Sequence, residues 1–156
     1  MEGREGEIRH TRGHARPRRR RENQMRRRHR QAHERSREVV LEKGDGTLAC
    51  ERCVVADNAP ARLRGLLGRP PLQRGQGLLL RPAGAIHTCF MRGEIDAVFL
   101  DRNLVVLDVA PNLRPWRFAA RRRSRAVLEL SPGESARRRI EPGSQLRLRA
   151  AGSEKR

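Results

Sequence analysis

The chain has 156 residues, a formal net charge of +18 and a hydrophobic fraction of 36%. This length suffices for one domain with a hydrophobic core. No apolar run approaches the roughly 18 residues of a membrane helix. No apolar segment of an export signal follows the N-terminal arginines. These absences argue against a membrane-spanning or exported chain, and we expect a monomeric cytoplasmic protein with no membrane span.

The positive charge is the dominant feature of the composition. Such a charge is typical of proteins that bind nucleic acid or acidic membranes. Arginine supplies 34 of the 36 basic residues, beside abundant alanine, glycine and proline. That bias is equally typical of a G+C-rich coding sequence, so the charge alone does not indicate a partner.

Residues 1–38 contain 14 arginines against six acidic residues, and their only large aliphatic side chains are Ile8 and Met25. Such a segment cannot offset its ordering entropy, so we expect a disordered tail. Three interpretations stay open: an arginine arm for nucleic acid or anionic lipid, a dispensable tail, or an over-extended gene start with the true start near Met25 or Val39. A single β-rich domain is predicted for residues 39–150, followed by a disordered tail at 151–156.

The first half of this domain alternates short apolar runs with turn signals. Residues 39–42 and 47–56 flank the Gly44-Asp45-Gly46 turn and predict a β-hairpin. A helix is predicted for residues 58–67, where an Asp-Asn pair can cap it and Gly68 ends it. Residues 77–80 predict another short strand.

Residues 86–109 hold the longest apolar runs of the chain and are predicted to form three strands, over 86–91, 97–100 and 104–109. Asp101-Arg102-Asn103 is suited to the tight turn between the last two. Residues 97–100 and 104–107 are apolar without alternation, so we expect both faces of these runs to be covered.

The remaining elements are short. Residues 111–125 predict a long basic loop, residues 126–130 and 145–149 two strands, and residues 134–140 one or two helical turns. Many short strands with one good helix favour a mainly β fold, either a sandwich or a partly closed barrel, over a parallel βαβ sheet.

Four ordered motifs resemble a known prokaryotic family. These are Arg62–Gly68 followed by Gly77–Leu80, the signature HTCFMRGEIDAVFLD from His87 to Asp101, VLELSPG from Val127 to Gly133, and the segment Ile140–Leu146. They are similar to the "domain of unknown function 192" over residues 48–148. The resemblance implies a compact, jelly-roll-like β-sandwich and no particular activity. Cys89-Phe90 and Gly93-Glu94 depart from the family pattern, which puts the path of that turn in doubt.

The signature contains the main candidate site. His87, Cys89 and Met91 alternate and would share one strand face, while Arg92 and Asp96 bracket a turn. These residues could form a pocket in which Asp96 fixes Arg92 or His87 beside a small anionic ligand. Alternatively, Asp96 pins the turn through backbone N–H groups, with Arg92 as its partner and His87 inside the domain. A Cys89 thiolate activated by His87 is a third reading.

Cys50 and Cys53 have the spacing of zinc ligands, and His87 with Cys89 would complete a set of four. A single CxxC is a weak signal, and residues i and i+3 of a strand face opposite sides. Without an export signal, reduced thiols are expected. We therefore predict two ordinary strand cysteines, with no metal and no cofactor.

A second candidate surface lies in the predicted basic loop. Trp116, Arg117 and Phe118 precede the Arg121, Arg122 and Arg123 run, and this is the one basic–aromatic cluster in a chain with four aromatic residues. Readers of single-stranded nucleic acid combine a basic groove with exposed rings. The alternative is a solvated loop whose Trp packs on the domain.

No catalytic triad, paired-carboxylate motif, phosphate loop or cofactor fingerprint is present in the sequence. The leading hypothesis is therefore a small non-catalytic binding or interaction module. Its ligand surface would comprise His87, Met91, Arg92 and Asp96, and its partner would be a protein or a small anionic ligand. The alternative, not favoured by the sequence, is a basic protein that binds nucleic acid through the N-terminal arm and the Trp116 loop.

Overall fold

A computed structural model of the chain describes residues 37–59, 62, 66 and 70–151. These residues belong to one compact unit, Ser36–Arg156. The tails predicted for 1–38 and 151–156 lie almost entirely outside the described residues, although the first strand begins at Arg37. Most of the helix predicted for 58–67 also lies outside them. Within that stretch, the Arg62 N–H donates to the Asn58 carbonyl in the i to i−4 pattern of a helix, and Leu66 is buried.

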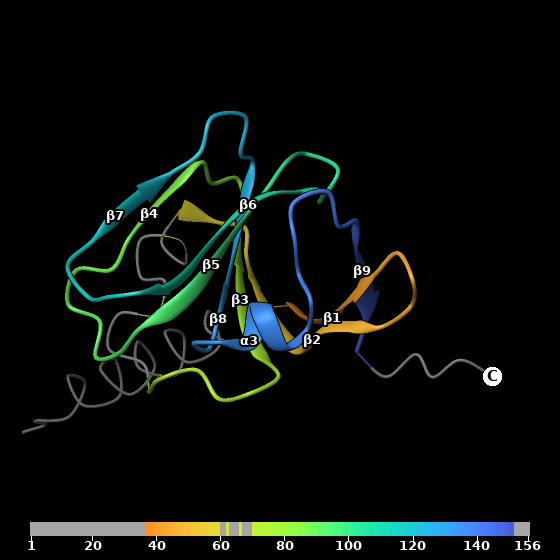
Figure 1. Cartoon of the computed structure of the whole chain (residues 1–156), viewed down its shortest axis with the longest axis horizontal. Helices are drawn as coiled ribbons and strands as arrows, with labels where there is room; N and C mark the ends of the chain where they lie inside the picture. The colour runs from red at the N-terminus through yellow and green to blue at the C-terminus, as the bar shows by residue number, and fades with distance from the viewer. Residues whose placement is uncertain (1–36, 60–61, 63–65, 67–69, 152–156) are drawn as a thin grey trace, which may run out of the picture. The chain divides into compact units, whose positions relative to one another are not determined.

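The described residues form nine strands and one short helix (Figure 1). In chain order these are β1 (Arg37–Lys43), β2 (Leu48–Ala56), β3 (Gln76–Leu80), β4 (Ala85–His87), β5 (Ile95–Leu100), β6 (Val106–Leu113), β7 (Phe118–Ala120), β8 (Ala126–Leu130), α3 (Glu134–Arg137) and β9 (Leu146–Ala150). The predicted hairpin, the strands at 77–80, 97–100, 126–130 and 145–149, and the helical turn after residue 134 are confirmed. None of the helices in this described part is long and apolar enough to cross a membrane.

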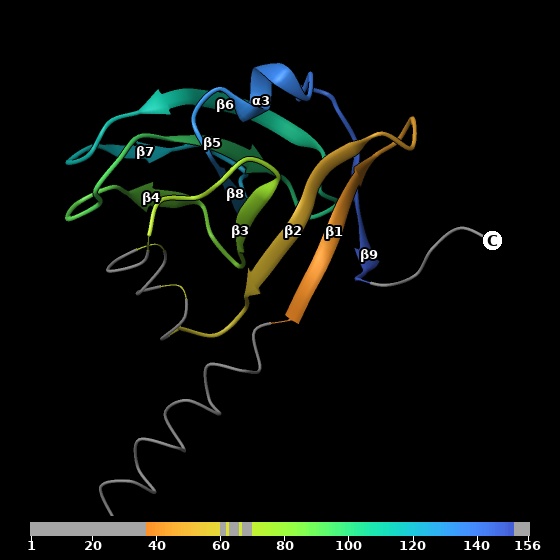
Figure 2. The ribbon, with the colours of Figure 1, turned by 90° about the horizontal axis from the view of Figure 1, so that it is seen from below.

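Seven strands form one curved sheet in the order β6-β5-β8-β3-β2-β1-β9. All neighbours run antiparallel except β2 and β3, which are parallel. Figure 2 shows the sheet bending from β6 round to β1 and β9. Its two edges meet at one end through a bridge between Val105 and Gln145. The sheet is not closed into a barrel, and the fold is mainly β as predicted.

The central strands are buried on both faces, because successive residues enter two different core clusters. In β5, Val98 and Leu100 join the cluster on one face, while Ala97 and Phe99 join the cluster on the other. All six residues of β5 are buried, which confirms the prediction for residues 97–100. For residues 104–107 the prediction is wrong, since Val106 alone of these four is fully buried. β6 is an edge strand and most of its residues are only half-buried.

A second sheet of two strands, β4 and β7, lies at the end of the domain away from β9 (Figure 1). Ile86 of β4 and Ala119 of β7 point into the second core cluster, so this sheet covers part of one face of the large sheet. The predicted strand at 86–91 is wrong beyond His87, where the chain leaves the strand. The predicted basic loop at 111–125 is also wrong, since it contains the end of β6 and all of β7.

Candidate functional site

Thr88 joins two irregular segments, residues 88–94 after β4 and residues 114–117 before β7. Its hydroxyl lies 2.6 Å from the Arg114 carbonyl, to which it can donate, and accepts the Arg117 N–H at 2.9 Å. Its backbone N–H donates to the Arg117 carbonyl, and its carbonyl accepts the Trp116 N–H. The side chain is fully buried. Thr88 therefore fixes both segments against each other, although they lie 26–29 residues apart in the chain.

These two segments and the adjoining β7 present three aromatic rings to solvent. Phe90, Trp116 and Phe118 are 70%, 58% and 71% exposed, and they are the exposed large hydrophobic residues of the described part of the chain. The rings of Phe90 and Trp116 meet edge-on, with centroids 4.5 Å apart. Both residues have a positive φ, 62° and 60°, which bulky residues adopt only where the surrounding structure demands it. The local backbone thus holds these two rings outward.

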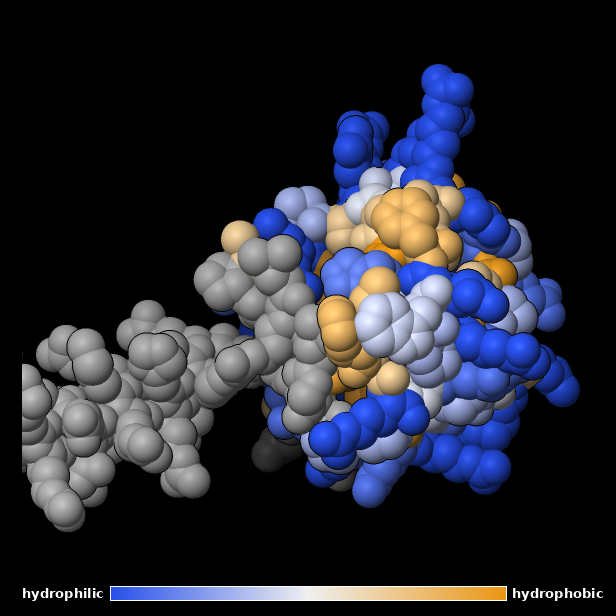
Figure 3. All heavy atoms as spheres, turned by 90° about the vertical axis from the view of Figure 1, so that its left-hand side faces the viewer, coloured by the Kyte–Doolittle hydropathy of each residue, from blue (hydrophilic) through white to orange (hydrophobic). Residues whose placement is uncertain are grey.

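Two arginines are close to the rings in the chain, one two positions after Phe90 and the other between Trp116 and Phe118. Arg92 and Arg117 are exposed, and neither forms an ion pair with any described residue. We call the set Phe90, Trp116, Phe118, Arg92 and Arg117 the aromatic–arginine surface. Figure 3 views this side of the domain, where apolar side chains gather between strongly hydrophilic ones.

The neighbouring arginines divide into paired and unpaired groups. Arg114 pairs with Glu94 at 3.5 Å. Arg121 pairs with Asp108 and lies over the Phe99 ring, 5.5 Å from its centroid. Within the residues described, Arg122 and Arg123 are exposed and have no carboxylate partner. They follow the other end of β7, so positive charge borders both ends of the small sheet.

The structure brings most of the two predicted candidate sets together. His87 of β4 is paired with Phe118 of β7, and both side chains are exposed. Met91 is half-buried and packs against the second core cluster, whereas the next residue, Arg92, is exposed. His87, Cys89 and Met91 do not share a strand face as expected, because Thr88 is pinned to residues 114–117 and the strand ends at His87.

Asp96 lies apart from this surface. Its side chain is fully buried in β5. One carboxylate oxygen accepts the N–H groups of Asn112 and Gly133, at 2.9 and 3.1 Å. The other accepts both the N–H and the hydroxyl of Ser135. Asp96 therefore does bind backbone N–H groups, but those of β6 and of the segment entering α3 rather than those of its own turn. Among the described residues, neither Arg92 nor His87 is a partner of its carboxylate.

Cys50 and Cys53 share one face of β2, contrary to the predicted opposite faces. The pairing of β2 with β1 slips between Val39–Cys53 and Leu41–Cys50, so an extra residue bulges out of β2 between the cysteines. Both are free thiols buried in the first core cluster. A hydrogen bond from Cys53 lowers the pKa of Cys50, and the same bond together with burial raises the pKa of Cys53 well above its usual range.

The described residues contain no group of three or more His, Cys, Asp and Glu side chains placed to hold a metal ion. Cys50 and Cys53 lie in the interior, whereas His87 is exposed. The four-ligand set considered from the sequence is therefore not assembled.

Fold and site together define a small, mainly β domain with an exposed aromatic–arginine surface. The chain belongs to the DUF192 family, described as "Uncharacterized ACR, COG1430", whose model matches residues 39–148. This confirms the family suggested by the sequence motifs.

Two archaeal relatives are named as UPF0127 proteins. The Thermococcus sibiricus protein is 33% identical over 84 residues, which cover 51% of this chain and 54% of the relative. The Pyrococcus furiosus protein is 35% identical over 95 residues, covering 58% of this chain and 81% of the relative. The matched region thus spans about half the length of the first relative.

Two solved structures share the fold. A "putative transcription regulator" of Sinorhizobium meliloti has a TM-score of 0.63 and 20% identity, with 71% of this chain and 92% of that chain covered. A protein of unknown function from Novosphingobium aromaticivorans has a TM-score of 0.59 and 22% identity, with 70% and 83% covered. At these identities the likeness shows the fold alone.

Proposed function

We propose that this domain is a non-catalytic binding module that takes up single-stranded nucleic acid on the aromatic–arginine surface. The observation that carries the proposal is the position of the exposed aromatic residues. Phe90, Trp116 and Phe118 all belong to the segments that Thr88 ties together or to the adjoining β7, and the arginines next to them in the chain form no ion pair with a described residue.

Exposed rings of this kind suit base stacking. Trp116 does not pack on the domain as a core residue would, since 58% of it is exposed and its ring touches Phe90. Every base offers a flat face, and each stacked base contributes roughly 1–3 kcal/mol to binding. Rings that the backbone holds outward lose little conformational freedom on binding, because they are already ordered.

The charge favours an anionic strand over a neutral partner. Arg92 and Arg117 stand beside the rings, and Arg122 and Arg123 extend the positive charge along the small sheet. Guanidinium groups can pair with phosphates and also stack on bases. The fold neighbour described as a "putative transcription regulator" adds only a likeness of fold to this argument.

Fluorescence anisotropy of the full chain with labelled oligo(dT), oligo(rU) and a duplex of the same length tests the proposal. We expect tighter binding of the single strands than of the duplex. Trp116→Leu and Phe118→Leu should each weaken single-strand binding by about tenfold, because leucine keeps an apolar contact but has no ring to stack.

The charge contribution is tested separately with a matched pair of arginines. Arg117→Gln should weaken binding and lower the slope of log K against log salt by about 0.7, the value for one phosphate contact on a single strand. Arg147→Gln, on the exposed side of β9, removes the same charge away from the surface and should leave the slope nearly unchanged. Equal binding of duplex and single strands, together with leucine variants that bind like the wild type, would refute the proposal.

A further inference from the structure

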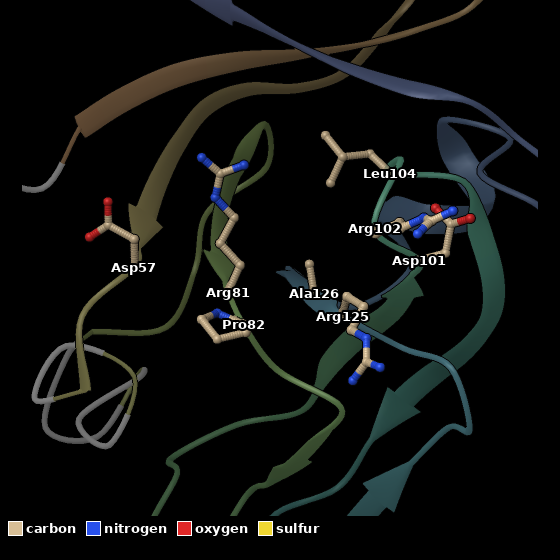
Figure 4. A pocket seen from close by; sticks show the side chains of 8 residues that line it. All are labelled: Asp57, Arg81, Pro82, Asp101, Arg102, Leu104, Arg125 and Ala126. Carbon is tan, nitrogen blue, oxygen red and sulfur yellow. The ribbon is translucent and has the colours of Figure 1, made fainter.

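A separate hollow of about 430 Å³ opens at the end of the large sheet where β2, β3 and β5 finish and β8 begins (Figure 4). Its volume is within the range of about 300–1,000 Å³ that small-ligand sites occupy. Asp57 and Arg81 border one side of it, and Arg102 and Leu104 border the other. It lies at the end of the small sheet away from His87 and Phe118, and it shares no residue with the aromatic–arginine surface.

Charged residues make up most of the lining of the hollow. They are Arg81, Arg102 and Arg125 together with Asp57 and Asp101. Asp101 is already engaged, since one of its oxygens accepts the N–H groups of Asn103 and Val105 at 2.8 and 2.9 Å. None of the three arginines forms an ion pair with another residue of the described part of the chain.

Arg81 is the side chain best placed to hold a ligand. Figure 4 shows its guanidinium extending into the space between Asp57 and Leu104, whereas the guanidinium of Arg125 points away. The backbone of Arg81 is held by a hydrogen bond from its N–H to the Ala56 carbonyl, at 3.0 Å. Arg81 is half-buried. A guanidinium in such a position presents a fixed fork of donors to a planar or tetrahedral oxyanion.

The remaining wall is apolar. Leu104, Pro82 and Ala126 line the hollow beside the charged groups. Leu104 has a positive φ of 62°, and its N–H donates to the Asp101 carbonyl, so the turn that carries it has a defined shape. An anchoring cation beside a small apolar wall suits a compact organic anion better than a free inorganic ion.

We propose that this hollow binds a small organic oxyanion, a carboxylate or a phosphate ester, whose charged group pairs with Arg81 and whose body contacts Leu104, Pro82 and Ala126. Arg102, on the opposite side, supplies a second positive charge to the anion. The site does not depend on the proposed nucleic-acid surface, because the two share no residues.

Titration calorimetry of the full chain tests this proposal with succinate, butyrate, glycerol phosphate and inorganic phosphate as probes, against chloride at matched ionic strength. We expect saturable binding of at least one organic anion, tighter than that of inorganic phosphate. The carboxylate and the phosphate-ester arms show which oxyanion the site prefers. Binding of inorganic phosphate alone, or the absence of saturable binding by every probe, would overturn the proposal.

Substitutions then locate the binding. Arg81→Gln should weaken it by at least about tenfold, and Arg81→Lys, which keeps the charge but loses the fork, should weaken it less. Arg147→Gln is the matched control and should bind like the wild type. Should Arg81→Gln fail to fold, Arg102→Gln, an exposed position, is expected to weaken binding several-fold. Wild-type affinity in the folded Arg81 variants would also overturn the proposal.

Discussion

Asp96 and Ser135 are 39 residues apart in the chain, yet one carboxylate oxygen of Asp96 accepts both the N–H and the hydroxyl of Ser135, at 2.9 and 2.5 Å. The other oxygen accepts the N–H groups of Asn112 in β6 and of Gly133 in the turn before α3. Because this carboxylate is fully buried, water cannot replace these bonds once they are lost. Asp96 thus ties β5, β6 and the start of α3 into one unit.

Asp96→Ala is expected to lower the free energy of unfolding by about 3–5 kcal/mol, because it removes four hydrogen bonds to a charged acceptor and leaves the buried N–H and hydroxyl of Ser135 without a partner. Ser135→Ala removes only the hydroxyl bond and should cost about 1.5–3 kcal/mol. Urea unfolding followed by circular dichroism measures both values.

Asp45 provides a matched control for this prediction. It accepts the N–H and the hydroxyl of Thr47, at 2.9 and 2.6 Å, as Asp96 does with Ser135, but on the exposed β1–β2 turn. Asp45→Ala should therefore cost only about 1 kcal/mol. Equal losses at Asp45 and Asp96 would show that burial does not set the cost, and would contradict the role given to Asp96.

Local sequence patterns predicted much of the fold. Alternation and turn residues located the β1–β2 hairpin, β3, β5 and β8, since these features depend on neighbours in the chain. The prediction failed where distant contacts decide the structure. The apolar run after His87 leaves its strand because Thr88 bonds to residues 114–117. No pattern within residues 86–91 signals this.

The bulge in β2 has a packing consequence at Gly77. A Cβ atom there would lie 2.8 Å from the Cys50 sulfur and 3.2 Å from the Glu129 carbonyl oxygen. Gly77→Ala should therefore destabilise the domain by about 1–3 kcal/mol through overpacking. Cys50→Ala removes the sulfur, so adding it to Gly77→Ala should restore part of the lost free energy of unfolding. The interaction energy between the two substitutions in the double-mutant cycle should be about 0.5–3 kcal/mol.

Gly93 is the control for this second prediction. Apart from its two chain neighbours, no heavy atom of the described residues lies within 4 Å of the position that a Cβ would take there. Gly93→Ala should change the free energy of unfolding by no more than about 0.5 kcal/mol. Strictly additive effects of Gly77→Ala and Cys50→Ala in thermal or urea unfolding would show that the sulfur is not the obstacle.

The candidate site was predictable in its chemistry but not in its assembly. From the sequence, the His87–Asp96 signature and the Trp116 loop were two distinct candidate sites, because no local sequence pattern indicates that such distant segments are in contact. Thr88, which joins these two segments, was not among the candidate residues, because nothing in the sequence indicates its partners 26–29 residues away. Asp96 was a candidate residue from the sequence, but its partners at Asn112, Gly133 and Ser135 could not be identified without the sheet order.

The three cysteines should differ in reactivity. Cys89 is half-exposed, while Cys50 and Cys53 are fully buried. A thiol must be accessible as well as ionised to react. The hydrogen bond from Cys53 lowers the pKa of Cys50, but the Cys50 thiol is buried and therefore stays unreactive in the folded chain. Iodoacetamide should add one group per native chain quickly, and the other two on the order of 100-fold more slowly.

Mass spectrometry of the intact chain measures these additions, and a urea-unfolded sample should carry three. Cys89→Ser should abolish the fast addition. Two or three rapid additions to the native protein would contradict the burial of the CxxC pair.

Glu134 links the stability of the domain to pH. It lies at the start of α3, where Arg138 donates to its carboxylate at 2.9 Å and Arg137 also pairs with it. Burial alone would raise the pKa of Glu134, but the hydrogen bonds from Arg138 and Arg137 outweigh it and hold the pKa below its ordinary 4.5. A carboxyl group whose pKa is lower in the folded than in the unfolded state stabilises the fold above the unfolded pKa, and this contribution is lost as pH falls through the folded pKa.

We therefore expect the stability difference between the wild type and Glu134→Gln to be largest near about pH 7 and to shrink below about pH 4.5. Urea midpoints at several pH values measure this difference. Glu141→Gln, at an exposed loop position, should give a small difference that changes little with pH. A Glu134→Gln difference that stays constant down to about pH 3 would mean that ionisation of Glu134 does not contribute to stability, since a neutral glutamate and a glutamine carry the same charge.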